Sequence, residues 1–358
     1  MRETTRVTGF ERALNGGLLS LMATVDSWAL AADAGLRYVD TGSPGYRRVR
    51  RGRGFSYLGE DGAPVNGSVR ERIRALAIPP AWDDVWICRD PSGHILATGH
   101  DKAGRKQYIY HPCWEETRDE AKFDRLAPFG RGLTGLRKSI DADLRSHGLS
   151  RTKVVALAVA VLDRTLVRVG NRRYADNDAY GLTTLTCDHI EVDGLHVHLE
   201  FAGKGGADHL LVFKDRRLSG LIAKCEELSG QTLFSYQSED GAVSSVTSND
   251  VNDYLATVMR GPFTAKDFRT WGASSLVTGE LASPSGPDDP DARLTAAIDM
   301  AAERLGNTRA VCRDSYVHPV VVEADADGRL AEAWKRSRGG KWANRSESTL
   351  RRLLDQAR

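Results

Sequence analysis

Between Phe55 and Tyr110, short runs of alternating apolar and polar residues predict an antiparallel β-sheet. The runs are FSYLG, VWICRD, HILATGHD and QYIYH, and turn dipeptides such as Asp61-Gly62 separate them. One segment there, SVRERIRALAIPPAW, has helical spacing, and its two prolines stop the helix. Upstream, the apolar segment LLSLMATVDSWALAADAGLRYV predicts a helix that ends near Gly35.

After His111 the hydrophobic spacing becomes that of helices. Two segments, WEETRDEAKFDRLAPFGRGLTGLRKSIDADLRSHG and RTKVVALAVAVLDRTLVRVG, repeat apolar residues about every 3.6 positions. A β-pattern returns in GLTTLTCDHIEVDGLHVHLEFAGKGGADHLLVFKD, with turns at 193–194 and 203–206. Helices resume through residue 318, interrupted by the polar, proline-rich loop at 283–291. The sequence therefore predicts an α+β protein, with a β-rich N-terminal domain followed by a mainly α-helical domain that carries a small antiparallel sheet.

A chain of 358 residues favours more than one domain. The change of pattern places the boundary between about residues 113 and 120. We divide the chain into a helical extension at 1–43, a β-rich domain at 44–115, a helical domain at 116–320 and a basic tail at 321–358. The tail predicts a loop and a short amphipathic helix, with Asn344 and Glu347 spaced as a capping pair. It either extends a DNA-binding surface or packs on the helical domain.

Composition indicates a globular protein, since 41% of residues are hydrophobic and 27% are charged. The longest uncharged run, residues 13–25, is too short to span a bilayer. Acidic residues interrupt the N-terminal apolar stretch, so no secretion signal is expected. Five scattered cysteines without a CxxC pair indicate reduced thiols and a cytoplasmic protein without a zinc site.

The net charge is only +2, but the positive charge is unevenly distributed. Residues 44–113 carry 12 Lys and Arg against 7 Asp and Glu, whereas residues 114–320 carry 25 against 30. Five arginines fall within residues 47–53. Such a run is usually a solvated loop, but it is also typical of an arm that contacts phosphates.

Five residues stand where chemistry could use them. Arg168 follows a helix, Lys204 occupies a hairpin turn, Arg269 lies near the start of a helix, and Asn307 precedes Tyr316 by nine residues. Each has an ordinary structural explanation when taken alone. The arginines suit ion pairs, the lysine and the asparagine suit turns, and the tyrosine suits packing at a helix end.

Taken together and in order, these residues resemble the type IB DNA topoisomerases of the poxvirus-like, bacterial branch. The resemblance covers about residues 45–320 and is carried by RRGRGFSYL, IPPAWDDVWIC, DKAGRKQYIYH, RVGNRRYADNDAYGLTTL, FAGKGG, KDFRTWGAS and NTRAVCRDSYVHP. It implies a monomeric protein of the nucleoid whose two domains clamp duplex DNA. It further implies breakage and rejoining of one strand through a 3′-phosphotyrosyl intermediate, relaxing positive and negative supercoils with no ATP, metal or other cofactor.

The resemblance also assigns roles to individual residues. Tyr316 matches the nucleophile, Arg168 and Arg269 match the pair that binds the nonbridging phosphate oxygens, and Lys204 matches the general acid. Asn307 stands where poxviral members have a histidine that touches the phosphate. The matching DNA contacts are Gln107, Tyr108 and Tyr110 in the N-terminal domain, and Arg173, Tyr174 and Lys266 around the active site.

This set of residues suits the reaction on chemical grounds. A tyrosine with a pKa near 10 is a poor nucleophile at pH 7, and its target is an anion. Bidentate arginines offset that repulsion, and a lysine can protonate the leaving alkoxide. Two departures matter: Asn307 supplies no titratable cation, and Asp314 places a negative charge two residues before Tyr316.

Two other functions share some of these features. Tyrosine recombinases use the same chemistry, but they typically carry H-x-x-R where this chain has Lys266-Asp-Phe-Arg269. An inactive DNA-binding architectural protein would fit the arginine run equally well, but it would not need all four of the residues Arg168, Lys204, Arg269 and Tyr316. The histidines His196 and His198 alternate on one strand without supporting carboxylates or cysteines, so no metal site is predicted. No nucleotide-binding glycine motif is present either.

Overall fold

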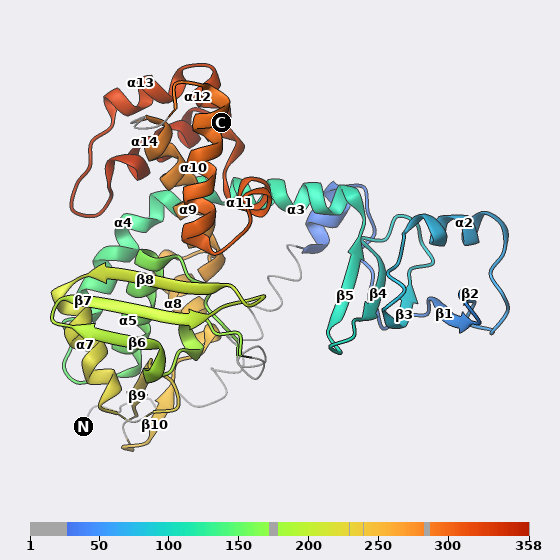
Figure 1. Ribbon diagram of the computed structural model, residues 1–358, viewed down its shortest axis with the longest axis horizontal. Helices are drawn as coiled ribbons and strands as arrows, with labels where there is room; N and C mark the ends of the chain where they lie inside the picture. The colour runs from blue at the N-terminus through green and yellow to red at the C-terminus, as the bar shows by residue number, and fades with distance from the viewer. Residues whose placement is uncertain (1–26, 172–177, 229, 239, 283–286, 358) are drawn as a thin grey trace, which may run out of the picture. The chain divides into compact units, whose positions relative to one another are not determined.

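The computed structural model describes residues 27–171, 178–228, 230–238, 240–282 and 287–357, and Figure 1 shows their secondary structure. The chain forms two compact units, residues 1–122 and residues 123–358. Within the described residues, no helix combines the length and apolar character needed to cross a membrane. Residues 27–33 are helical, and the helix ends before Gly35, whose φ of +67° terminates it, as the sequence predicts.

The first unit is built on a five-stranded antiparallel sheet with the strand order β2-β1-β3-β4-β5. Its strands are β1 (Tyr46–Arg51), β2 (Gly54–Leu58), β3 (Asp83–Ile87), β4 (Ile95–His100) and β5 (Lys106–Tyr110). Helix α2 (Gly67–Ala75) packs Ile73 against Val85, Ile87 and Ala97 of the sheet. The β-sheet prediction for this part of the chain is therefore confirmed.

The arginine run at residues 47–53 forms a hairpin of strands β1 and β2 instead of a loop. Arg48 is held inside this unit, because its guanidinium donates to the carbonyl oxygens of Ile78 (3.2 Å), Pro79 (3.0 Å) and Trp82 (2.5 Å). It also lies 4.1 Å from the centre of the Phe55 ring. The other arginines of the run, Arg47, Arg50, Arg51 and Arg53, are exposed.

The second unit is mainly helical. Helix α3 (Pro112–Asp124) leads into it, and its remaining helices are α4 (Leu126–Asp143), α5 (Arg151–Thr165), α7 (Arg216–Glu226), α8 (Ser248–Met259), α9 (Ala265–Ala282), α10 (Pro290–Leu305), α11 (Arg309–Tyr316), α12 (Pro319–Ala326), α13 (Arg329–Arg336) and α14 (Arg345–Gln356). A three-stranded antiparallel sheet contains β6 (Ile190–Asp193), β7 (His196–Ala202) and β8 (Asp208–Lys214). A second, two-stranded sheet, β9 (Ser235–Gln237) and β10 (Val243–Ser245), lies where the sequence predicts helices.

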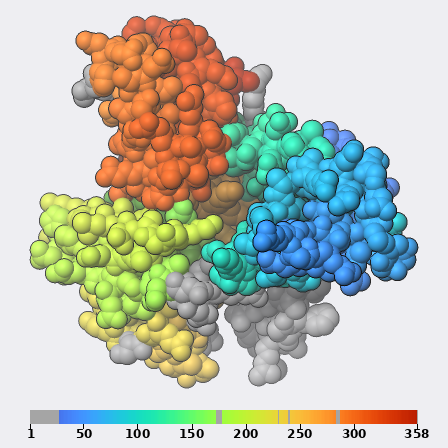
Figure 2. All heavy atoms as spheres, turned by 45° about the vertical axis from the view of Figure 1, so that its right-hand side comes forward, coloured from blue at the N-terminus to red at the C-terminus, as the bar shows by residue number. Residues whose placement is uncertain are grey.

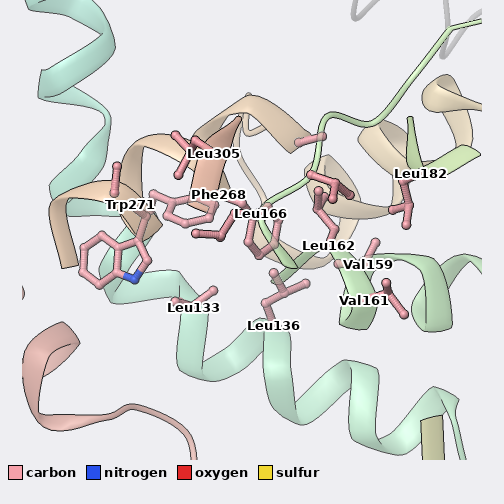
Figure 3. Close-up of a cluster of buried hydrophobic side chains, with 14 of the residues drawn as sticks. Leu133, Leu136, Val159, Val161, Leu162, Leu166, Leu182, Phe268, Trp271 and Leu305 are labelled. Carbon is pink, nitrogen blue, oxygen red and sulfur yellow. The ribbon is translucent and has the colours of Figure 1, made fainter. Parts of the chain in front are cut away.

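Helices α5 and α9 form the centre of this unit. The middle of α5 is buried, and its residues there are all apolar, VVALAVAVL, whereas both ends of the helix are polar. Figure 3 shows Leu162 and Leu166 of this region packed near Phe268 of α9 and Leu305 at the end of α10. This packing brings the ends of α5 and α10 to one face of α9.

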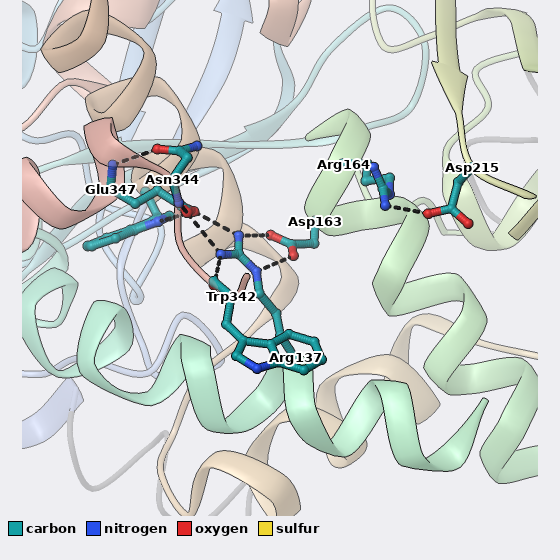
Figure 4. Close-up of polar contacts among 8 residues, drawn as sticks. Arg137, Asp163, Arg164, Asp215, Trp342, Asn344 and Glu347 are labelled. Atoms are coloured by element: carbon teal, nitrogen blue, oxygen red, sulfur yellow. Dashed lines mark hydrogen bonds and ion pairs between the residues drawn. The ribbon is translucent and has the colours of Figure 1, made fainter. Parts of the chain in front are cut away.

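The C-terminal helices pack on the rest of the unit, so of the two alternatives for the tail the structure shows packing. Helix α14 contacts α9, α4 and α13, and Figure 2 shows the C-terminal helices (orange and red) as one lobe beside the segment of β6–β8 (yellow-green). Asn344 and Glu347 cap the start of α14 reciprocally, as predicted. Glu347 also forms a buried ion pair with Arg137, which in turn binds Asp163 (Figure 4).

Candidate active site

Arg269 is buried in the first half of α9, where it connects the ends of two other helices. Its Nη1 donates to the carbonyl oxygen of Leu166 (2.5 Å), and its Nη2 donates to that of Leu305 (2.9 Å). These carbonyls lie where α5 and α10 end in left-handed caps, so they have no partner in their own helices. Only 3% of the Arg269 surface is exposed. The side chain is thus fixed in one position.

The first turn of α9 is fixed by Asp267. Its carboxylate accepts from the backbone N–H of Thr264 (2.7 Å) and from the Arg125 guanidinium (3.1 Å), which completes a capping arrangement at the helix start. Lys266 projects from the same turn and is exposed. Although they are only three residues apart on α9, Lys266 therefore lies at the surface and Arg269 lies in the interior.

Arg168 and Asn307 meet although they are 139 residues apart. Arg168 follows the end of α5, and its Nη2 donates to the Asn307 Oδ1 (2.5 Å). Asn307 comes directly after Gly306, whose left-handed conformation (φ +60°) ends α10. The two helix ends that bind Arg269 thus also bring these two side chains together.

Tyr316 is the last residue of α11, and it lies beside Arg269. The Arg269 Cζ is 5.1 Å from the centre of the phenol ring. Burial by itself raises the pKa of Tyr316, but the charges of Arg269, Arg168 and Lys266 outweigh it and lower the pKa below its usual value. The surroundings therefore favour the phenolate that would act as a nucleophile.

Ser274 holds the backbone of Tyr316 in place, and sequence reasoning missed it. Its hydroxyl donates to the Tyr316 carbonyl oxygen (3.1 Å) and accepts from the His318 N–H (2.9 Å). The side chain is fully buried. In the sequence it is one of several small polar residues of α9, beside Ser275 and between Thr270 and Thr278, so nothing singles it out.

Three buried N–H donors in this cluster have no acceptor among the described residues. They are Arg168 Nη1, Arg269 Nε and Asn307 Nδ2. Leaving a buried donor unpaired costs about 1–3 kcal/mol, so native proteins rarely do so without a functional reason. Two of the three belong to cations. The arrangement is suited to binding an anion with several oxygen atoms next to Tyr316.

Lys204 lies in the turn between β7 and β8, as predicted. The turn is closed by the Gly203 N–H, which donates to the Ala207 carbonyl oxygen (2.7 Å), and it uses left-handed glycines at 205 and 206. Lys204 is exposed, and within the described part of the chain it has no hydrogen bond or ion pair. The structure therefore brings Arg168, Arg269, Asn307 and Tyr316 together and leaves the Lys204 ammonium free to move.

The predicted DNA contacts of the first unit lie on β5, an edge strand. Tyr108 and Tyr110 stack on one face with their ring centres 5.7 Å apart, and 42% of Tyr108 is exposed. Gln107 points to the opposite face and donates to the Asp101 carboxylate (2.9 Å). Arg173 and Tyr174 lie outside the described residues.

Among the described residues, no group of three histidine, cysteine or acidic side chains could hold a metal ion. Asp314 is exposed on α11, and within the described residues it forms no ion pair.

Two family models match the chain. "Eukaryotic DNA topoisomerase I, catalytic core" matches residues 111–334, and "Bacterial DNA topoisomerase IB, N-terminal domain" matches residues 54–101. Curated relatives include the DNA topoisomerase 1B of Acanthamoeba polyphaga mimivirus, which is 32% identical over 290 residues, or 78% of this chain and 86% of the relative. The DNA topoisomerase 1B of vaccinia virus (strain Copenhagen) is 23% identical over 272 residues, or 72% and 82%. With both models matched in order and a relative above 30% identity over most of its length, the chain belongs to the type IB DNA topoisomerases.

Proposed function

We propose that this chain breaks and rejoins one strand of duplex DNA through a 3′-phosphotyrosyl bond to Tyr316. The reaction relaxes positive and negative supercoils and requires neither ATP nor a metal. The observation that supports this most directly is the set of three unpaired buried donors, from Arg168, Arg269 and Asn307, beside a tyrosine of lowered pKa. An anionic phosphodiester satisfies all three donors and places its phosphorus within reach of that tyrosine.

In the proposed cleavage step, the Tyr316 hydroxyl gives its proton to solvent and its oxygen attacks the phosphorus. The bond from phosphorus to the 5′-oxygen breaks, and the 5′-oxygen leaves with a proton from the Lys204 ammonium. Arg168, Arg269 and Asn307 donate to the nonbridging oxygens, whose charge grows in the transition state. These three side chains are already held in place, so little reorganisation is needed.

Resealing is the reverse reaction. The 5′-hydroxyl returns its proton to Lys204, and its oxygen attacks the phosphorus. The bond from phosphorus to the Tyr316 oxygen breaks, and Tyr316 takes up a proton from solvent. Because the ester bond to Tyr316 conserves the energy of the phosphodiester, no ATP is consumed.

Duplex DNA is the proposed partner of both units. We assign phosphate contacts to Lys266 and to the exposed arginines of the β1–β2 hairpin, and groove contacts to the stacked pair Tyr108 and Tyr110. Gln107 donates one amide N–H to Asp101, and its second N–H and its carbonyl oxygen would contact a base. Arg173 and Tyr174 keep the contacts that the resemblance implies.

The test is relaxation of supercoiled plasmid in EDTA without ATP, with positive and negative supercoils tested separately. The parent should relax both, and detergent should trap covalent DNA adducts. Tyr316→Phe should neither relax DNA nor form an adduct, while binding DNA as tightly as the parent. A parent that binds DNA but relaxes nothing would overturn the proposal in favour of a binding protein.

A further inference from the structure

His209 lies on the hairpin that carries Lys204, and it is buried. It occupies the second position of β8, directly across from Phe201 on β7, and only 6% of its surface is exposed. The two rings stack with their centres 4.9 Å apart and an angle of 19° between their planes. The ring is therefore fixed at the base of the Lys204 turn.

Two glycines make room for this ring. A Cβ atom added to Gly203 would lie 2.7 Å from both Cδ2 and Nε2 of His209. A Cβ atom added to Gly306 would lie 2.3 Å from Cε1 and 2.8 Å from Nε2 of the same ring. The imidazole thus sits against two backbone segments at once, the turn before Lys204 and the turn before Asn307.

This contact connects the turn that carries Lys204, the proposed general acid, with Asn307 and Arg168, the proposed phosphate ligands. On one side, the turn with Lys204 is closed by two backbone hydrogen bonds, from the Gly203 N–H to the Ala207 carbonyl oxygen (2.7 Å) and from the Gly206 N–H to the Gly203 carbonyl oxygen (3.1 Å). It contains three glycines, two of them left-handed, so its backbone has little rigidity of its own. On the other side, Asn307 is fixed through its bond to Arg168. His209 is the side chain that packs the flexible turn against the fixed one.

The charges around the ring favour its neutral form. Burial lowers the pKa of His209 most, and the nearby Arg168 and Arg269 lower it further, against a smaller opposite effect of Asp208. A neutral ring can pack beside two guanidinium groups without repulsion. At neutral pH His209 therefore acts through its shape.

We infer that His209 is a positioning residue that sets where Lys204 delivers its proton. The inference rests on the proposed function, and it assigns His209 to leaving-group protonation and not to phosphate binding. Replacing the ring by a methyl group would free the Lys204 turn while leaving Arg168, Arg269 and Asn307 in place.

The chemistry of the leaving group separates these two roles. A 5′-alkoxide requires a proton as it leaves, whereas a thiolate, with a thiol pKa near 8.5, leaves without one. A loss of proton delivery therefore slows cleavage at an ordinary 5′-oxygen and is relieved when a sulfur atom replaces that oxygen. A loss of phosphate binding slows cleavage of both substrates.

The experiment measures single-turnover cleavage of two DNA duplexes that differ only in this bridging atom, at a site first mapped with the parent. His209→Ala should slow the oxygen substrate on the order of tenfold to a hundredfold and cleave the sulfur substrate at nearly the parental rate. Lys204→Ala should show the same pattern, and Asn307→Ala should slow both substrates. His209→Phe keeps a flat ring in the same place and should retain more oxygen cleavage than His209→Ala.

Leu211→Ala is the matched control, since Leu211 is a buried residue on the same strand and face that packs into the core instead of the turn. It should lower the melting temperature without changing the ratio of the two rates. Equal slowing of both substrates by His209→Ala, or no slowing, overturns the inference. A selective loss in His209→Phe as large as that in His209→Ala also overturns it, because ring shape is then not what matters. A parent that cleaves neither duplex refutes the proposed function instead.

Discussion

Glu347→Gln tests whether the C-terminal helix is an integral part of the second unit. Glu347 is 6% exposed, and its carboxylate accepts from Arg137 twice, at 2.7 and 2.9 Å. It also accepts from the Trp271 indole (3.1 Å) and from the Asn344 N–H (2.9 Å). Glutamine has the same shape but no charge, and its amide N–H₂ would face donors where an oxygen now accepts.

The size of the effect follows from the burial of this pair. Removing one partner of a buried ion pair costs 3–5 kcal/mol, and we expect about 3 kcal/mol because Asp163 still neutralises Arg137. For a unit of more than 200 residues, about 3 kcal/mol corresponds to a fall in melting temperature of roughly 6–12 °C. Relaxation activity should persist below the new transition.

The effect should also depend on pH. Burial alone would raise the pKa of Glu347, but its hydrogen bonds and ion pair with Arg137 lower the pKa overall. A carboxyl group whose folded pKa is depressed stabilises the fold above its unfolded pKa, near 4.5, and loses that contribution as the pH falls through the folded pKa. The difference between parent and Glu347→Gln should therefore be full at pH 7 and shrink below about pH 4.5.

Scanning calorimetry of the full chain measures this effect, because it separates the transitions of the two units. Glu332→Gln on α13 is the control, since Glu332 pairs with Lys335 at the surface, and its melting temperature should match that of the parent. If Glu347→Gln is no less stable than Glu332→Gln, the buried pair does not hold α14 in place. A difference that stays constant down to pH 3 would show that charge is not its cause.

Two further predictions concern residues near Tyr316. Asn307→His should give a cleavage rate that rises, relative to the parent, as the pH falls and the new histidine becomes protonated. The pKa of that histidine should lie below the usual 6.5, because Arg168 and Arg269 disfavour a third cation there. Superimposable pH profiles of the two proteins would contradict this. Asp314→Asn should bind duplex DNA about two- to five-fold more tightly at low salt and lose that advantage at high salt, as measured by fluorescence anisotropy, because an exposed negative charge near the DNA phosphates is removed. Unchanged affinity at low salt would show that Asp314 lies away from the DNA.

The sequence predicts the local parts of the site well. The alternation in FAGKGGADHLLVF, with its glycines, is enough to predict a hairpin with Lys204 at its turn, because turn geometry depends on nearby residues. The strands of the first unit and the capping pair of α14 are predicted for the same reason. The residues that determine each of these elements lie within the element or a few residues from it.

The arginine-rich composition of residues 47–53 is a poor guide to their structure. Five arginines within residues 47–53 indicate a loop or an arm that contacts phosphates, yet residues 46–51 form a strand in which the positions of Tyr46, Arg48 and Val49 are partly buried. Arg48 occupies such a position because three carbonyl oxygens in the segment between α2 and β3 accept its donors. Those acceptors are about 30 residues away, so a local pattern cannot indicate them.

The central contacts of the site depend on even longer separations. Arg269 is fixed by carbonyls 103 residues before it and 36 residues after it, and Arg137 binds a carboxylate 210 residues away. A local sequence pattern cannot identify these partners, because the chain contains many arginines and many helix ends that could pair with one another. For the same reason Ser274 and His209 gave no recognisable signal.

The same long-range hydrogen bonds explain why three donors at this site have no acceptor among the described residues. Two of the Arg269 donors bind helix ends, which holds the guanidinium rigidly and leaves its Nε without a partner. Among the described residues, the bond from Arg168 to Asn307 likewise leaves Arg168 Nη1 and Asn307 Nδ2 without an acceptor. Folding therefore fixes these donors at a cost of about 1–3 kcal/mol each, which the phosphate bound in the proposed reaction would recover. Because the cost is met on folding, the proposed attack by Tyr316 would require no reorganisation of these three donors, which would stabilise the growing negative charge of the transition state from positions already fixed.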